Sequence, residues 1–219
     1  MDSVTSKMQT KLLNLGYDVG TIDGVGGPVT GKCLADAIGS GKIRLDDVDL
    51  IALKSICRNT PNRKTICSLY GTPNYIEGKK PGSIQILNVT EWRKNLCEIE
   101  FEPLIGGKRF KLTINRKVAL SVLGAFAEIS IKNNAMLPDQ RWCPKVIQSY
   151  CARHNRWDAR EPLSVHTWAA AIDIDPSTNG IGAKTDIPDW AIRVLKDWGA
   201  VWGGDWTRYP DPMHFQWMR

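Results

Sequence analysis

The sequence has few histidines and no paired-cysteine motif. Its 219 residues include three histidines, and its six cysteines form no CxxC pair. A zinc site built from thiolates is therefore not expected. We expect the cysteines to be mostly small buried residues, because cysteine outside a disulfide behaves as a small hydrophobic residue. The sequence leaves open whether any of them pair. The scarcity of histidine makes the position of each one informative.

Long apolar runs and a secretion signal are also missing. No stretch reaches the roughly 18 apolar residues of a membrane span, and the N-terminal residues lack the basic and apolar regions of a signal peptide. We therefore expect no stable membrane insertion, and synthesis in the cytoplasm. Action outside the cytoplasm would then need a separate release route.

The positive charge is not concentrated in one region. A net charge of +6 and a pI near 9.0 favour approach to polyanions, which include nucleic acids and anionic cell-surface polymers. The basic residues are spread through the chain without interleaved aromatic residues, so we expect no nucleic-acid partner. The content of 42% hydrophobic and 24% charged residues is typical of a folded globular protein.

Residues 1–57 have the pattern of a small helical module. Apolar residues recur there at helical spacing in three segments, and glycines such as Gly16 end or separate them. The helices are expected over 6–15, 29–38 and 46–56. Residues 58–82 are rich in proline, glycine, asparagine and lysine, and we interpret them as a linker that merges into the irregular start of a second domain.

Residues 83–219 are expected to form that second domain. Alternating or clustered apolar residues predict its strands, and apolar residues on one face predict its helices. Strands are expected over 83–89, 97–103, 108–114, 146–152 and 169–174 and around Val201 and His214, with helices over 116–131 and 188–198. This order predicts an α+β fold with an antiparallel sheet, preceded by the small three-helix module.

Two of the three histidines lie in short acidic segments. Six residues separate His166 from Asp173 in SVHTWAAAIDID, and two separate Asp211 from His214 in DPMH. Imidazole nitrogens and carboxylate oxygens are suitable ligands for a catalytic zinc ion, which has three protein ligands and an open position for water. Either spacing alone arises by chance, and a lone histidine is more often structural. The two segments together make a metal site the stronger interpretation.

The apolar stretch around Asp173 adds to this interpretation. An unpaired carboxylate is costly to bury, and a metal ion would offset that cost. Strand alternation predicts that Asp173 and Asp175 share one face, opposite Ile172 and Ile174. The role of Asp175 stays open between a partner of the site and a turn-forming residue before proline.

The N-terminal segment resembles the three-helix peptidoglycan-binding module found at the ends of many cell-wall hydrolases. The matching residues are the LxxLGY pattern of 12–17, Gly20, the IDG triplet of 22–24, Gly27 and Thr30. The resemblance implies a wall-binding role for Tyr17, Asp23, Gly24 and Thr30. Turn chemistry alone gives Asp23 and Thr30 a capping role in the loop and the second helix.

The C-terminal segments SVHTWAAAID, WGGDW and DPMHF resemble a zinc metallopeptidase family. That family contains D-alanyl-D-alanine carboxypeptidases and phage L-alanyl-D-glutamate endopeptidases. Its pattern SxHxxGxAxD falls on residues 164–173, with Ala169 in place of the glycine. The resemblance implies that His166, Asp173 and His214 bind Zn²⁺ and that Asp211 is the catalytic base.

Three further residues are expected at this site. Arg153, in the segment YCARH, would stabilise the oxyanion, although a surface charge or a salt bridge is the alternative. Ser164 and Trp206 are expected to contact the substrate. His154 is not expected to be a ligand.

The two resemblances together predict a phage endolysin, a peptidoglycan hydrolase that cleaves the L-alanyl-D-glutamate bond with zinc-activated water. We expect a monomer that binds bacterial peptidoglycan, is made in the host cytoplasm and needs a holin to reach the wall. One alternative is a D-alanyl-D-alanine carboxypeptidase. Another is a non-catalytic wall-binding or virion protein that retains a zinc fold, although Asp211 argues against it because a structural zinc needs no base.

Overall fold

The N-terminal part of the chain is helical. In the computed structural model, which describes residues 3–59 and 61–218, it contains α1 (Val4–Asn14), α2 (Pro28–Gly39) and α3 (Val48–Cys57). Ser3 caps α1 by accepting a hydrogen bond from the Ser6 N–H, and Asp47 caps α3 in the same way. Proline opens α2, where its missing N–H costs no helical bond. The three predicted helices are therefore present.

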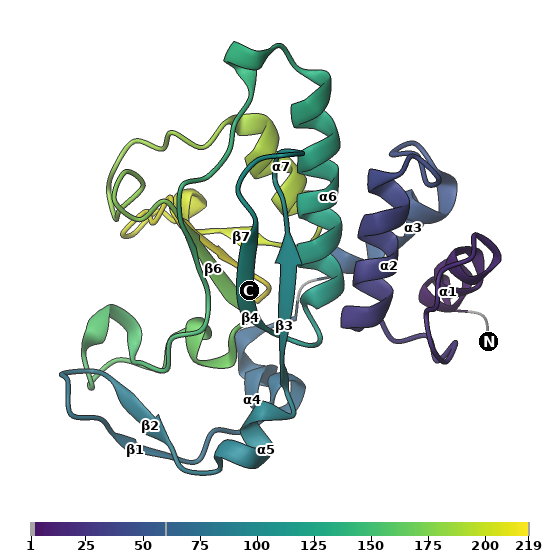
Figure 1. Cartoon of the computed structure of the whole chain (residues 1–219). Coiled ribbons are helices and arrows are strands. Elements are labelled where there is room, and N and C mark those ends of the chain that lie inside the picture. Colours follow the sequence, from purple (N-terminus) through teal and green to yellow (C-terminus); the bar gives the residue numbers. More distant parts are fainter. Residues whose placement is uncertain (1–2, 60, 219) are drawn as a thin grey trace.

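The rest of the described chain is a mixed α+β domain with antiparallel sheets, as predicted. Its helices are α4 (Ile66–Tyr70), α5 (Val89–Arg93), α6 (Ala119–Ala135) and α7 (Asp189–Asp197). Its strands are β1 (Tyr75–Glu77), β2 (Ile84–Ile86), β3 (Leu96–Phe101), β4 (Phe110–Asn115), β5 (Ile147–Gln148), β6 (Ala171–Ile174), β7 (Val201–Trp202) and β8 (His214–Gln216). Strands β1–β2 and β3–β4 form hairpins (Figure 1). The largest sheet has the strand order β5-β6-β8-β7.

Three predicted strands are shorter than expected by two residues or more. The strand over 146–152 is reduced to β5, and the strand over 83–89 ends at Ile86, since α5 begins at Val89. Strand β6 begins at Ala171 because Ala169 has a left-handed backbone, with φ of 51°. Apolar runs mark burial but not the length of the hydrogen-bonded ladder, and these segments are buried partly as loops.

Asp175 does not continue β6. Its φ is 46°, and its carboxylate accepts hydrogen bonds from the N–H groups of Lys145 and Val146 at 2.8 and 2.6 Å. The alternation that predicted a shared face with Asp173 therefore stops at Ile174. Asp175 is the turn-forming residue of the two possibilities.

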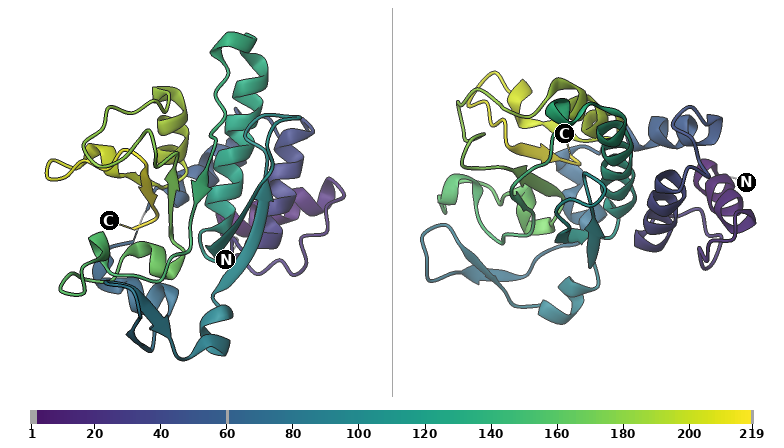
Figure 2. Two further views of the ribbon diagram at one scale, coloured as in Figure 1. Left: turned by 60° about the vertical axis from the view of Figure 1, so that its left-hand side comes forward. Right: turned by 45° about the horizontal axis from the view of Figure 1, so that its top comes forward.

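The helical part and the α+β domain share one hydrophobic core. Helix α2 lies along α6, as both views of Figure 2 show. A Cβ atom on Gly31 of α2 would lie 2.9 Å from the Leu120 Cα atom of α6, so glycine permits a backbone approach that a side chain would block. The two parts are packed together and not merely joined in sequence.

A buried polar cluster crosses the same boundary. Lys54 of α3 lies 2.7 Å from the Glu128 carboxylate of α6, and Trp198 donates to the same carboxylate at 3.0 Å. The Lys54 and Glu128 side chains are only 12% and 6% exposed. Such a buried pair fixes the relative position of the two parts, because loss of either partner leaves a buried charge.

Residues 61–82 pack against the domain. Tyr70 is buried and donates to the Trp217 carbonyl at 2.7 Å, and Trp168 donates to the Gly71 carbonyl at 2.8 Å. Arg63, in the short turn η1 (Arg63–Thr65), donates to the Leu163 carbonyl. Within the described chain, no helix has the length and apolarity needed to cross a membrane.

Candidate metal centre and active site

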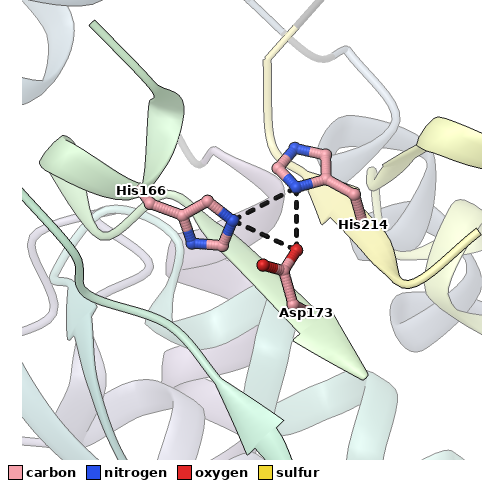
Figure 3. A group of neighbouring side chains, drawn as sticks. All are labelled: His166, Asp173 and His214. Carbon is pink, nitrogen blue, oxygen red and sulfur yellow. Dashed lines mark hydrogen bonds and ion pairs between the residues drawn. The ribbon is translucent and has the colours of Figure 1, made fainter. Parts of the chain in front are cut away.

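Three side chains converge on one point beside the two inner strands of the largest sheet (Figure 3). His166 comes from the turn η4 (Val165–Trp168), Asp173 from β6 and His214 from β8. His166 Nε2 and His214 Nδ1 are 3.2 Å apart and lie 3.1 and 2.9 Å from Asp173 Oδ1. Tetrahedral zinc with bonds of about 2.0 Å places its ligands about 3.3 Å apart. The three atoms therefore have the spacing of a zinc site.

The other ring nitrogens show which atoms carry the protons. His166 Nδ1 lies 2.6 Å from the Ser149 carbonyl, which only accepts, so Nδ1 carries the hydrogen. His214 Nε2 lies 3.0 Å from Gln216 Oε1, whose amide nitrogen donates to the Met218 carbonyl. Both hydrogens point away from the convergence point, which leaves His166 Nε2 and His214 Nδ1 as lone-pair donors. Metal-binding histidines are oriented by oxygen acceptors in this way.

These protonation states leave three electron-rich atoms in contact. Burial raises the pKa of Asp173, but hydrogen bonds and positive charge from protonated His166 and His214 rings outweigh burial and hold the pKa well below its usual range, so a cation at this point keeps the carboxylate ionised. All three side chains are buried. Facing lone pairs beside a carboxylate repel unless a cation lies between them. The residues present thus fit Zn²⁺, whose ligands are imidazole nitrogens and carboxylate oxygens.

The local sequence explains how these ligands meet. The Ser164 hydroxyl accepts a hydrogen bond from the His166 N–H at 3.3 Å and opens η4. Ala169 ends η4 in its left-handed conformation and turns the chain into β6. Asp173 and His214 then pair directly across the antiparallel β6–β8 ladder, which brings their side chains together.

Asp211 lies beside the three ligands. Its N–H donates to the Gly203 carbonyl at 2.9 Å, and its carbonyl accepts from the His214 N–H at 3.0 Å. A Cβ on Gly203 would lie 2.5 Å from the Asp211 carbonyl oxygen, so only glycine fits there. Asp211 Oδ1 is buried and has no hydrogen-bond partner among the described residues. Burial, assisted by the charge of Asp173, raises the pKa of Asp211, as suits a general base.

Arg153 and Trp206 lie on the walls of the site. The Arg153 guanidinium is 5.3 Å from the Trp157 ring and donates to the His154 carbonyl, and the described chain contains no ion-pair partner for it. The Trp206 ring centre lies 5.4 Å from that of His214. Ser164 also lines this region, but its hydroxyl holds the turn that carries His166.

The third histidine is elsewhere. His154 Nδ1 is bonded to the Glu161 carbonyl and Nε2 to the Glu77 carboxylate at 3.0 Å. Both ring nitrogens are therefore occupied within the scaffold.

The residues predicted to bind the wall have contacts inside the helical part. The Gln9 amide nitrogen donates to Asp23 at 2.9 Å and to Thr30 at 3.2 Å, and its oxygen accepts from the Gly24 N–H at 2.9 Å. Tyr17 is half-buried, and its hydroxyl is bonded to Ser40. The structure thus gives these residues scaffold contacts, and a wall-binding role stays a prediction.

Sequence reasoning missed three residues of the site. Gln216 follows His214 by two positions in β8, so strand alternation is a signal for it. Ser149 acts through its backbone carbonyl, which leaves no signature in the sequence. Arg63 lines the site from the presumed linker, and no local pattern connects it to residues one hundred positions away.

One of three comparisons with known proteins found a match. Residues 157–217 match the protein-family model described as D-alanyl-D-alanine carboxypeptidase. The match includes His166, Asp173, Asp211 and His214, and it leaves out Arg153 and the helical part. No curated protein and no solved structure matches. The match supports a zinc peptidase domain of the kind that acts on peptidoglycan peptides, and such peptidases depend on zinc in general.

Proposed function

We propose that the chain is a peptidoglycan hydrolase that cuts the stem peptide at the L-alanyl-D-glutamate bond. One observation carries the proposal: three buried atoms converge beside Asp211, whose Oδ1 has no hydrogen-bond partner in the part of the chain that the structure describes. A structural zinc site has no use for such a carboxylate. A catalytic site uses it to move a proton.

The residues around the site have distinct tasks. Zn²⁺ held by His166, Asp173 and His214 would supply a Lewis acid that makes water nucleophilic near neutral pH. Asp211 accepts the proton of the attacking water and passes it to the leaving amine. Arg153 donates hydrogen bonds to the oxygen on which negative charge develops.

The surroundings of the site favour an endopeptidase over the alternative D-alanyl-D-alanine carboxypeptidase. A cavity of about 580 Å³ lies on the side of His166 and Asp173, and another of about 360 Å³ lies on the side of Asp211 and His214. These two cavities support a substrate that extends on both sides of the scissile bond. A carboxypeptidase needs room for only one residue on the leaving side.

We also propose an endolysin role, which concerns the whole chain and not only the site. It includes anchoring to peptidoglycan through α1–α3, release from the host cytoplasm with the help of a holin, and action as a monomer. Its support is the resemblance of the N-terminal segment together with the peptidase match.

Muropeptide mass spectrometry tests the reaction. Zinc-loaded protein is incubated with purified peptidoglycan, and new fragments beginning with D-glutamate are the expected product. Chelation of zinc, or His166→Ala, is expected to abolish their release, while His154→Gln is the control at the histidine outside the site. Release of terminal alanine alone would favour the carboxypeptidase. Wall binding without any released peptide, in a protein verified to contain zinc, would favour the non-catalytic alternative.

A further inference from the structure

Arginines dominate the cavity on the Asp211 side of the site. Its charged lining consists of four arginines and two acids: Arg63, Arg153, Arg156, Arg208, Glu161 and Asp211. Arg156 is already paired with Glu161. Three guanidinium groups therefore face this cavity with Asp211 as the remaining carboxylate, so the cavity attracts an anion.

Arg63 is one of these three guanidinium groups. It is half-buried, and its Nη2 donates to the Leu163 carbonyl at 2.7 Å. Burial lowers the pKa of Arg63, which reflects the loss of water around the charge. Within residues 3–59 and 61–218, no carboxylate forms an ion pair with it, in contrast to Arg156. A partly desolvated guanidinium is stabilised when a carboxylate arrives, because the charged hydrogen bonds replace the lost water.

The position of Asp211 shows which part of the substrate enters this cavity. The base passes its proton to the leaving amine, so the leaving residue must lie next to Asp211. Asp211 lines the cavity that contains Arg63, and it does not line the cavity on the opposite side. The arginines therefore meet the residue whose nitrogen is released.

That residue has a free carboxylate in the proposed substrate. The D-glutamate of the stem peptide is linked onward through its side chain, so its α-carboxylate lies one carbon from the scissile nitrogen. A planar guanidinium binds such a group through two parallel hydrogen bonds. Amidation of the carboxylate removes both its charge and one acceptor.

We propose that Arg63 binds the free α-carboxylate of the leaving residue and makes the enzyme selective for stem peptides in which this carboxylate is not amidated. The inference rests on the proposed function. It gives the segment 58–82 a direct part in substrate recognition. Arg63 contacts substrate away from the reacting atoms, so its loss affects KM more than kcat.

Two synthetic stem peptides test the selectivity. They differ only in an α-carboxylate or an α-carboxamide on the D-glutamate, and kcat/KM is measured for each with the zinc-loaded full chain. Wild type is expected to prefer the carboxylate by roughly 10- to 100-fold, the range of hydrogen bonds to charged groups. Arg63→Gln is expected to lose the preference, and Arg63→Lys to retain part of it. Arg160→Gln is the control, because Arg160 is exposed and paired with Asp158.

A binding measurement separates this inference from the proposed reaction. The leaving fragment, γ-D-glutamyl-lysine with its α-carboxylate free or amidated, is titrated into each folded variant by calorimetry. Tighter binding of the carboxylate form by wild type and Arg160→Gln, but not by Arg63→Gln, supports the inference even if neither peptide is cut. Equal binding of both fragments by wild type, or no binding of either, overturns it. An unchanged preference in Arg63→Gln overturns it as well.

Discussion

The helical part and the candidate site differ in the hydrogen-bond partners of their motif residues. In the helical part, Asp23, Gly24 and Thr30 are bonded to the buried amide of Gln9. At the candidate site, the facing nitrogens of His166 and His214 contact each other and Asp173 Oδ1, and Asp211 Oδ1 has no hydrogen-bond partner among the described residues. Satisfied polar groups hold a fold together, whereas unsatisfied buried ones await a ligand. The motif residues therefore have contacts inside the fold in one part and surround a candidate ligand site in the other.

Replacement of the unsatisfied carboxylate gives the largest expected effect. Asp211→Asn removes the base but none of the proposed metal ligands, so we expect kcat to fall about 100- to 10,000-fold with bound zinc unchanged. Peptide-cleavage kinetics and metal analysis on the same sample measure both quantities. Asp205→Asn, at an exposed residue of the neighbouring turn, is the control. A parallel loss of zinc would instead make Asp211 part of the metal site.

The pair between Lys54 and Glu128 tests whether contacts between the helical part and the α+β domain stabilise the fold. Lys54→Met leaves Glu128 buried without its closest cation, and we expect it to lower the free energy of unfolding by about 3 kcal/mol. Lys94→Met breaks an exposed pair with Glu91 and should cost less than about 1 kcal/mol. Urea denaturation compares the two variants. Equal losses would show that the boundary pair contributes no more than a surface pair.

Gln9→Ala tests whether the N-terminal motif residues act as a scaffold. It removes the common partner of Asp23 and Thr30, and we expect a loss of about 1–3 kcal/mol in unfolding free energy. Hydrolysis of a small soluble stem peptide should not change, because the site lies in the other part. Thr10→Ala, on the exposed side of the same helix, is the control. A drop in peptide hydrolysis by folded Gln9→Ala would show that Gln9 does more than stabilise the helical part.

Ala169→Gly gives the smallest expected change. Glycine relieves the left-handed backbone at φ of 51° but loses a buried methyl group, and each effect is about 1 kcal/mol. We expect melting temperatures to shift little and zinc affinity to stay unchanged. A large loss of zinc would show that the methyl group positions His166.

The sequence predicted the parts of the site that lie in short motifs. His166, Asp173 and His214 meet as expected because strand pairing and one tight turn place them. The expected strand over 146–152 was wrong in length, since an apolar run reports burial but not the ladder that satisfies its backbone. Ser149 and Arg63 were missed because their contacts depend on tertiary packing. Such packing joins residues that no local period connects.

The approach of Gly31 to Leu120 has a consequence for how the enzyme would reach its substrate. A flexible linker lets a catalytic domain search a volume around its anchor. Here α2 and α6 are in contact through their backbones, so the helical part has a fixed distance and direction from the candidate metal centre. If the helical part anchors the chain to the wall, the distance from the anchor point to the cleaved bond is fixed. The protein would then select bonds at one spacing from the anchor point. A chimera with helices from another protein would lose both that spacing and the shared hydrophobic core.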